Sequence, residues 1–173
     1  PIDDKLAEPD QNVQKFINSF KSKVDRKYKT LICKFAQTLT HPKREVETTL
    51  GNLVADAFAQ NAGCDVMLVG SGSIRIKKMG PLVTLKDLLT CFPYDDTLNR
   101  YQVKGRDLKR IFNYIMRPEN RDGEGECYQV NHGVHAVYSD KKNQLLSLKI
   151  KGQPVNNQKD YTLCLQGYHF KSA

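Results

Sequence analysis

A run of small residues follows an apolar segment in the sequence DVMLVGSGSIR, residues 65–75. Glycine and serine let backbone N–H groups approach a ligand closely, and arginine offers a planar set of donors suited to phosphate or carboxylate oxygens. A loop that leaves the C-terminal end of a buried strand is where open α/β sheets usually bind ligands. The candidate binding residues are therefore Gly70, Ser71, Gly72, Ser73 and Arg75. The competing interpretation is a tight turn whose arginine points into solvent.

The sequence carries no complete set of catalytic groups. GSGSIR lacks the Gly-Lys-Ser/Thr ending of a P-loop, and its spacing differs from the Gly-x-Ser-x-Gly of a nucleophile elbow. His132 and His135 would need further converging ligands to hold a metal, and no Asp-x-His or His-Glu-x-x-His motif accompanies them. We therefore predict no catalytic residue and no metal site within this chain.

The five cysteines show no CxxC pair, and four of them lie inside apolar runs. A free thiol in such a run behaves as a small hydrophobic side chain. We therefore predict reduced core thiols at Cys33, Cys64, Cys91, Cys127 and Cys164.

Length and composition favour one compact domain. The 173 residues are 39% hydrophobic, which is enough for one core and too few for two comfortable domains. The net charge of +8 favours anionic partners such as nucleic acid, nucleotides, phosphorylated sugars or an anionic surface. No apolar stretch approaches the ~20 residues of a membrane span. Because the sequence opens with Pro1, we expect it to be a fragment of a longer protein.

Helix and strand patterns alternate along the chain, with helices early and an antiparallel portion late. This order predicts the α+β class, as a single mixed α/β domain. The expected helices are 10–27, 48–63, 84–92 and 106–116, and the expected strands are 29–39, 65–70, 97–105, 127–130, 134–139, 145–150 and 161–165. In the first helix one face gathers the apolar residues Val13, Phe16, Ile17, Phe20 and Val24.

Six sequence stretches, considered together and in this order along the chain, are informative: REVETTLGNLVADAF, DVMLVGSGSIR, LLTCFPYDDTL, VKGRDLKRIF, YQVNHGVHAVY and YTLCLQGY. Together they resemble the C-terminal, substrate-binding domain of the 5′-nucleotidase family, which includes UDP-sugar hydrolases and 2′,3′-cyclic phosphodiesterases. The family counterparts of the first three run Arg-x-x-Glu-x-x-Leu-Gly-Asn-Leu, Asn-Gly-Gly-Gly-Ile-Arg and Pro-Phe-x-Asn. The resemblance implies an N-terminal helix over 1–28 that leads into a 5′-nucleotidase C-terminal domain over 29–173.

The resemblance also implies a division of labour. In that family a separate N-terminal metallophosphoesterase domain carries two divalent metal ions and hydrolyses nucleotide phosphate esters, whereas the C-terminal domain holds the nucleoside part of the substrate. The metal motifs of that catalytic domain are absent from this sequence. We therefore expect two partners, a nucleotide or nucleoside substrate and the N-terminal domain of the parent chain. We also expect an inactive isolated fragment and an extracytoplasmic or cell-surface parent.

Four residues take their roles from the resemblance. Arg75 matches the arginine that contacts the substrate, and Arg44 matches an upstream arginine that would be a second anionic or ribose contact. Tyr94 and Tyr168 take the places of two aromatic residues that stack on opposite faces of the nucleobase. The alternatives are a solvated charge for Arg44, a turn aromatic packing on its neighbours for Tyr94 and a strand-ending residue for Tyr168. Asn52 and Asp56 are possible polar anchors for the loop at 70–73.

Two departures from the family pattern affect these expectations. Gly-Ser-Gly-Ser replaces Asn-Gly-Gly-Gly at 70–73, so a side-chain amide expected beside the substrate is missing. The sequence also ends at Ala173, before a Gly-Gly-Asp-Gly run that follows the second aromatic in the family, so we expect a domain shortened at its C-terminal end.

Two other functional classes stay open. The charge of +8 is compatible with a nucleic-acid-binding module, although the lysines and arginines are dispersed and no recognised nucleic-acid motif is present. The altered loop is compatible with a surface interaction domain that kept the fold without its ligand.

Overall fold

The computed structural model describes residues 8, 10–121 and 127–168. The helices are α1 (Gln11–Tyr28), α2 (Thr49–Ala62), the single 3₁₀ turn η1 (Ser71–Ser73), α3 (Leu85–Cys91), α4 (Gly105–Ile115) and α5 (Pro118–Arg121). The strands are β1 (Leu31–Lys34), β2 (Leu39–Thr40), β3 (Val66–Gly70), β4 (Lys78–Met79), β5 (Leu82–Thr84), β6 (Leu98–Lys104), β7 (Tyr128–Val130), β8 (Val134–Ser139), β9 (Gln144–Ile150), β10 (Gln153–Pro154) and β11 (Asp160–Gln166).

The main sheet has four strands in the order β6-β11-β3-β7. Strand β11 runs parallel to β3 and antiparallel to β6, and β7 is antiparallel to β3. All five residues of β3 are buried, as its unbroken apolar run predicts for a strand covered on both faces. A separate sheet in the order β10-β9-β8 is antiparallel throughout, which confirms the predicted late antiparallel portion and the mixed α/β class.

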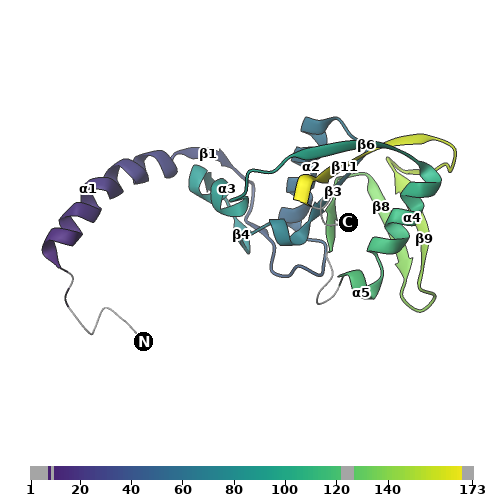
Figure 1. Cartoon of the computed structure of the whole chain (residues 1–173), viewed down its shortest axis with the longest axis horizontal. Helices are drawn as coiled ribbons and strands as arrows, with labels where there is room; N and C mark the ends of the chain where they lie inside the picture. Colours follow the sequence, from purple (N-terminus) through teal and green to yellow (C-terminus); the bar gives the residue numbers. More distant parts are fainter. Residues whose placement is uncertain (1–7, 9, 122–126, 169–173) are drawn as a thin grey trace.

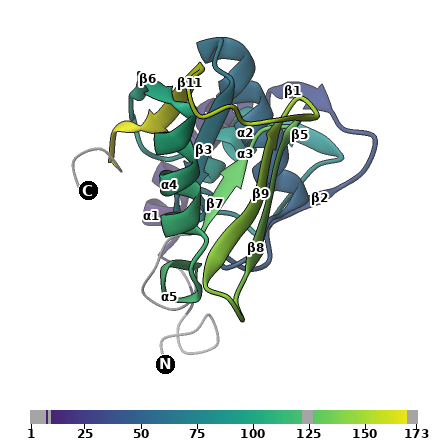
Figure 2. The same cartoon turned by 90° about the vertical axis from the view of Figure 1, so that its right-hand side faces the viewer.

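Alternate residues of β3 pack in two different hydrophobic clusters. Met67 and Val69 pack in a cluster with Leu50 and Val54 of α2 on one face of the sheet. Val66 and Leu68 join the other cluster, whose further members include these side chains of α4, β8, β9 and β11: Leu108, Phe112, Val134, Leu148, Ile150 and Leu163. Figure 2 shows α4 beside the β8–β9 hairpin on the side of the sheet away from α2. The central sheet is therefore covered on both faces.

Helix α1 leaves its apolar face uncovered by the described residues. Asp10 caps its first turn by accepting hydrogen bonds from the N–H groups of Asn12 (2.8 Å) and Val13 (2.9 Å). The helix extends away from the body of the domain on the side of β1 and α3 (Figure 1). The five apolar residues predicted to share a face are between 48% and 66% exposed: Val13, Phe16, Ile17, Phe20 and Val24.

Helix ends follow the signals in the sequence. The Thr48 hydroxyl accepts from the Gly51 N–H at 3.1 Å and so caps α2, which ends at Gly63 in the left-handed conformation with φ 61°. At α3, Thr84 and Asp87 form a reciprocal capping box, as their spacing predicts. Both helices therefore start where the sequence indicates.

The prediction of one strand over 29–39 is wrong. Strand β1 pairs with β5 and β2 pairs with β4, and the chain bends between them, where the Phe35 N–H donates to Pro81 O at 2.7 Å. Two partners on either side of a bend require two short strands. Strands β4, β5 and β10 were not expected because two or three residues are too few to show a period. The short helix α5 was not among the expected helices, and residues 122–126 lie outside the described part.

The five cysteines are free thiols in different environments. Cys91 and Cys164 are buried, whereas Cys33 lies exposed on β1, so the prediction of a core position is wrong for Cys33. Burial raises the pKa of the Cys91 thiol to about 11. Burial and, secondarily, the neighbouring Cys164 thiol raise the pKa of Cys64 to about 12. Since the thiolate is the reactive form, both groups are poor nucleophiles near neutral pH.

Native thiol labelling tests this distribution. We expect one fast modification, at Cys33, when the folded chain meets a maleimide at pH 7, because the other thiols are at least partly covered and Cys64 and Cys91 ionise only at high pH. Mass spectrometry of peptides after timed quenching measures it. The Cys33→Ser variant is the control and loses the fast phase. Equal labelling rates for Cys33 and Cys91 in the native state would contradict the assignment.

Candidate functional site

Hydrogen bonds to β11 and to the residue before β7 hold the loop at 70–73. The Gly70 N–H donates to Oε1 of Gln166 at 3.2 Å, and the Ser71 N–H donates to Cys127 O at 2.9 Å. Ser71 is fully buried. Gly70 and Ser71 are therefore buried in the domain. Gly72 and Ser73 are partly exposed, and Arg75 is exposed.

Gln129, on β7, links this loop to the start of α2. Its side chain is fully buried, and its Nε2 donates to the Ser71 hydroxyl (2.5 Å) and to Val46 O (2.9 Å). Its Oε1 accepts from the Thr48 N–H at 2.8 Å. A side chain on Gly51 would overlap the Gln129 amide, so a glycine at 51 makes room for this contact. One primary amide thus satisfies polar groups of two segments, residues 46–48 and the loop at 70–73.

His41 completes the support of the loop. It is 4% exposed, and its Nε2 lies 3.0 Å from Ser71 O, to which it donates because a carbonyl oxygen only accepts. Its Nδ1 lies 2.8 Å from the Thr48 hydroxyl. The backbone N–H of His41 donates to Lys77 O at 2.7 Å. The imidazole therefore connects the N-cap of α2 to the first residue of η1, and the His41 backbone adds a contact with the segment that follows η1.

Arg44 and Arg75 line the same small pocket. Its volume is about 180 Å³, and its walls are two short segments, 41–44 and 74–77. The Arg75 guanidinium donates from Nη1 to Gly72 O at 3.2 Å, and the Arg75 N–H donates to Cys91 O at 3.0 Å. The structure thus brings together the two arginines singled out in the sequence, although about 30 positions separate them.

Tyr94 and Tyr168 lie outside this pocket on two segments that are joined by hydrogen bonds. Each tyrosine is 67% exposed. The Gly167 N–H donates to Thr97 O at 2.8 Å, and the Tyr168 N–H donates to Oδ2 of Asp96 at 3.3 Å. The end of β11 is therefore attached to the loop that carries Tyr94, and both rings expose most of their surface.

The polar anchors of the loop differ from those expected. Asn52 donates from Nδ2 to Oε1 of Glu47 at 2.9 Å, and Asp56 accepts from the His132 N–H. Neither holds the loop at 70–73, so the expectation for Asn52 and Asp56 is wrong. Their side chains steady the segment before α2 and the turn before β8 instead.

The side chains that do hold the loop are His41, Gln129 and Gln166, and Thr48 in turn binds His41 and Gln129. The one available signal was glutamine in otherwise apolar strands at 128–130 and 160–166. A buried polar side chain needs a partner, but the sequence does not show which one. Among the described residues no three His, Cys, Asp or Glu side chains are grouped to hold a metal ion.

Residues 26–173 match the sequence family described as 5′-nucleotidase, C-terminal domain. The chain belongs to this family. The resemblance noted in the six motifs is thereby confirmed. A 5′-nucleotidase precursor from Thermus thermophilus has the same fold, with a TM-score of 0.70 at 20% identity, and the match covers 95% of this chain and 35% of that one.

Curated relatives of this 5′-nucleotidase C-terminal domain are considerably longer. A snake venom 5′-nucleotidase from Macrovipera lebetinus is 28% identical over 146 residues, which cover 75% of this chain and 35% of the relative. Endonuclease YhcR from Bacillus subtilis is 28% identical over 124 residues, or 70% of this chain and 10% of the relative. The chain thus spans between a tenth and about a third of these relatives. Within the described residues no helix has the length and apolar character needed to cross a membrane.

Replacing Gln129 tests how much its side-chain amide contributes to the stability of the fold. Gln129→Leu keeps the volume but leaves the buried Thr48 N–H and Ser71 hydroxyl without their partner. Each unsatisfied buried group costs about 1–3 kcal/mol, so the free energy of unfolding should fall by about 2–4 kcal/mol in urea titrations. Gln144→Leu, at the exposed start of β9, is the matched control and should change it by less than about 0.5 kcal/mol. Equal effects of the two variants would contradict this role.

Proposed function

We propose that this chain is the substrate-binding domain of a 5′-nucleotidase-type hydrolase and that it holds a nucleoside or nucleotide while a separate domain cleaves the phosphate ester. The observation that carries the proposal is the shared pocket of Arg44 and Arg75. Two guanidinium groups on the walls of one pocket are suited to anionic oxygens, since arginine binds phosphate and carboxylate through paired N–H donors. The polar part of the ligand would lie there, with Gly72 and Ser73 nearby.

The base would lie between the rings of Tyr94 and Tyr168. Their high exposure leaves ring faces available, and stacking on aromatic faces binds any base without reading its edge. The Arg75 N–H bond to Cys91 O ties the arginine to the end of α3, three residues before Tyr94. The backbone thus connects the proposed anion subsite with the proposed base subsite.

The catalytic part of the parent would be a metallophosphoesterase domain with two divalent metal ions, which would supply the activated water. The uncovered apolar face of α1 supports a neighbouring body, since five apolar side chains on one helix are rarely left in water. Most of the helix lies before the start of the family match at residue 26. We assign its apolar face to contact with that domain. The venom origin of one relative supports an extracytoplasmic or cell-surface parent.

The isolated chain should be catalytically silent. Under this proposal the reaction needs metal-activated water, which the missing domain would provide. Purified chain incubated with AMP and Mg²⁺, Mn²⁺ or Zn²⁺ should release no phosphate above buffer in a colorimetric assay, while an intact 5′-nucleotidase serves as the positive control. Metal-dependent turnover that copurifies with the chain through successive columns would overturn this division of labour.

Ligand binding tests the site directly. Arg75→Ala or Tyr94→Ala should weaken nucleotide binding by about ten-fold or more, because one charge-assisted contact or one stacking face contributes roughly 1–3 kcal/mol. NMR titration of the full chain with millimolar AMP measures it through the resonances of residues 70–75 and 92–96. Both variants should keep the native melting temperature because the two side chains are exposed.

Matched controls for this titration lie on α4. Arg110→Ala and Tyr114→Ala remove an exposed arginine and a 57% exposed tyrosine that lie outside the pocket and outside segments 70–75 and 92–96, and both should bind AMP as the native chain does. The proposal is wrong if AMP and adenosine leave the resonances of 70–75 and 92–96 unmoved. Shifts caused only by long single-stranded oligonucleotides, with steep salt dependence, would indicate a nucleic-acid-binding module instead.

A further inference from the structure

The pocket between 41–44 and 74–77 carries more positive charge than its two arginines. Lys43 and Lys77 also line it, so four of its eight lining residues are cationic. No aspartate or glutamate is among the residues that line it. All four cationic side chains are exposed rather than buried in the domain. The pocket is therefore an open concentration of positive charge.

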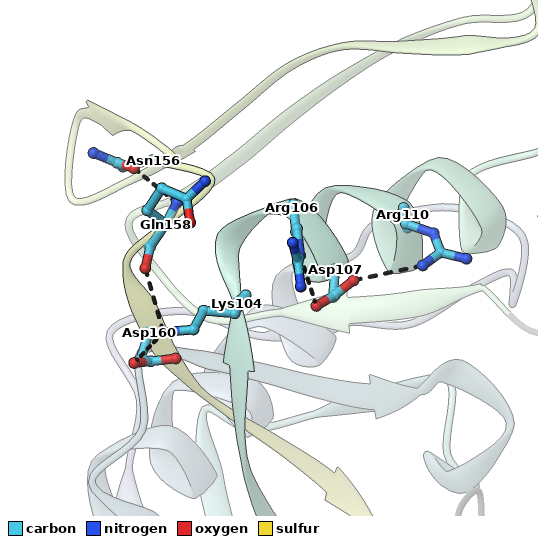
Figure 3. A network of polar contacts seen from close by, with 7 residues as sticks. All are labelled: Lys104, Arg106, Asp107, Arg110, Asn156, Gln158 and Asp160. Atoms are coloured by element: carbon cyan, nitrogen blue, oxygen red, sulfur yellow. Dashed lines mark hydrogen bonds and ion pairs between the residues drawn. The ribbon is translucent and has the colours of Figure 1, made fainter.

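None of these four cations forms an ion pair in the described part of the chain. The cations around α4 differ. Figure 3 shows Asp107 between Arg106 and Arg110, at 3.6 Å and 3.5 Å, and Asp160 beside Lys104 at 2.8 Å. Within the described residues, none of the four pocket cations is paired in this way.

Buried contacts fix the two walls of the pocket. The His41 N–H donates to Lys77 O at 2.7 Å, and the His41 imidazole donates to Ser71 O at 3.0 Å. Like charges on two fixed walls repel each other, and a sufficiently charged anion relieves that repulsion. A phosphate monoester carries only about −1.5 to −2 near pH 7, which two cations balance. Four cations are suited to an anionic group that carries more negative charge than a single phosphate monoester.

We propose that Lys43 and Lys77 are specificity-determining residues that make this pocket select ligands with two linked phosphate groups over those with one. The inference rests on the proposed function and names its substrate class, a nucleoside diphosphate or a diphosphate ester of a nucleoside. Arg44 and Arg75 would bind one phosphate group, and the two lysines would bind the second. A lysine ammonium suits this task because it acts as a compact point charge without strict geometry.

Calorimetric titration of the full 173-residue chain at low salt tests the proposal with uridine, UMP, UDP and inorganic pyrophosphate. UDP should bind about ten-fold more tightly than UMP, the size of one added charge-assisted contact. The double variant Lys43→Ala/Lys77→Ala should bring the UMP-to-UDP ratio below about three-fold while leaving uridine affinity within about two-fold. The control Lys34→Ala/Lys78→Ala removes the same net charge from exposed lysines outside the pocket and should keep the native ratio.

The outcomes separate this inference from the proposed function. Equal affinities of UMP and UDP for the native chain, or equal losses in the two double variants, would overturn the role of the lysines while nucleoside binding stands. Pyrophosphate binding as tight as UDP binding, with no uridine binding, would overturn nucleoside recognition and keep the selection of diphosphate. Absence of binding by both UDP and pyrophosphate would overturn the anion pocket itself.

Discussion

The buried Gln129 amide is the contact on which the arrangement of this domain depends. Its acceptor faces the start of α2 and its donors face the loop at 70–73 and the segment before α2. These segments lie 58 to 83 positions away in sequence, so the amide closes long loops that no local signal would close. An unpaired polar group in the interior costs free energy. The amide therefore stabilises the one arrangement of these segments in which its hydrogen bonds form, and other arrangements are less stable.

The candidate site follows from that arrangement. Three backbone hydrogen bonds join distant segments around it: His41 to Lys77, Arg75 to Cys91, and Gly167 to Thr97. Arg75 and Lys77 stand on backbone that forms these bonds, and Arg44, Tyr94 and Tyr168 lie within three residues of one of them. Their positions are therefore set by the interior, and the surface is left free to vary in charge. A change of ligand preference would then require only a change of side chain, as we propose for Lys43 and Lys77.

Sequence patterns predicted the parts of the fold whose signals are local. The apolar run at 66–70 predicted a buried strand, and the apolar pattern of the following and preceding segments predicted helices at 84–92 and 48–63. The segment 29–39 was misjudged because alternation does not show that its two halves pair with different strands. The role of Gln129 was missed because a single buried glutamine has no period and its partners lie far away. For the same reason no local pattern predicted the pocket shared by Arg44 and Arg75, and the resemblance indicated only that each contacts the substrate.

The two hydrophobic clusters share strand β3, whose successive residues enter them alternately. Separating β3 from either cluster would expose the residues that stabilise the other, so neither cluster keeps its packing alone. Helix α4 with the β8–β9 hairpin and helix α2 with the loop at 70–73 are thus parts of one cooperative unit. We therefore expect the domain to unfold in a single transition, and we expect the loop at 70–73 to share the global stability of the fold rather than the low local stability typical of surface loops.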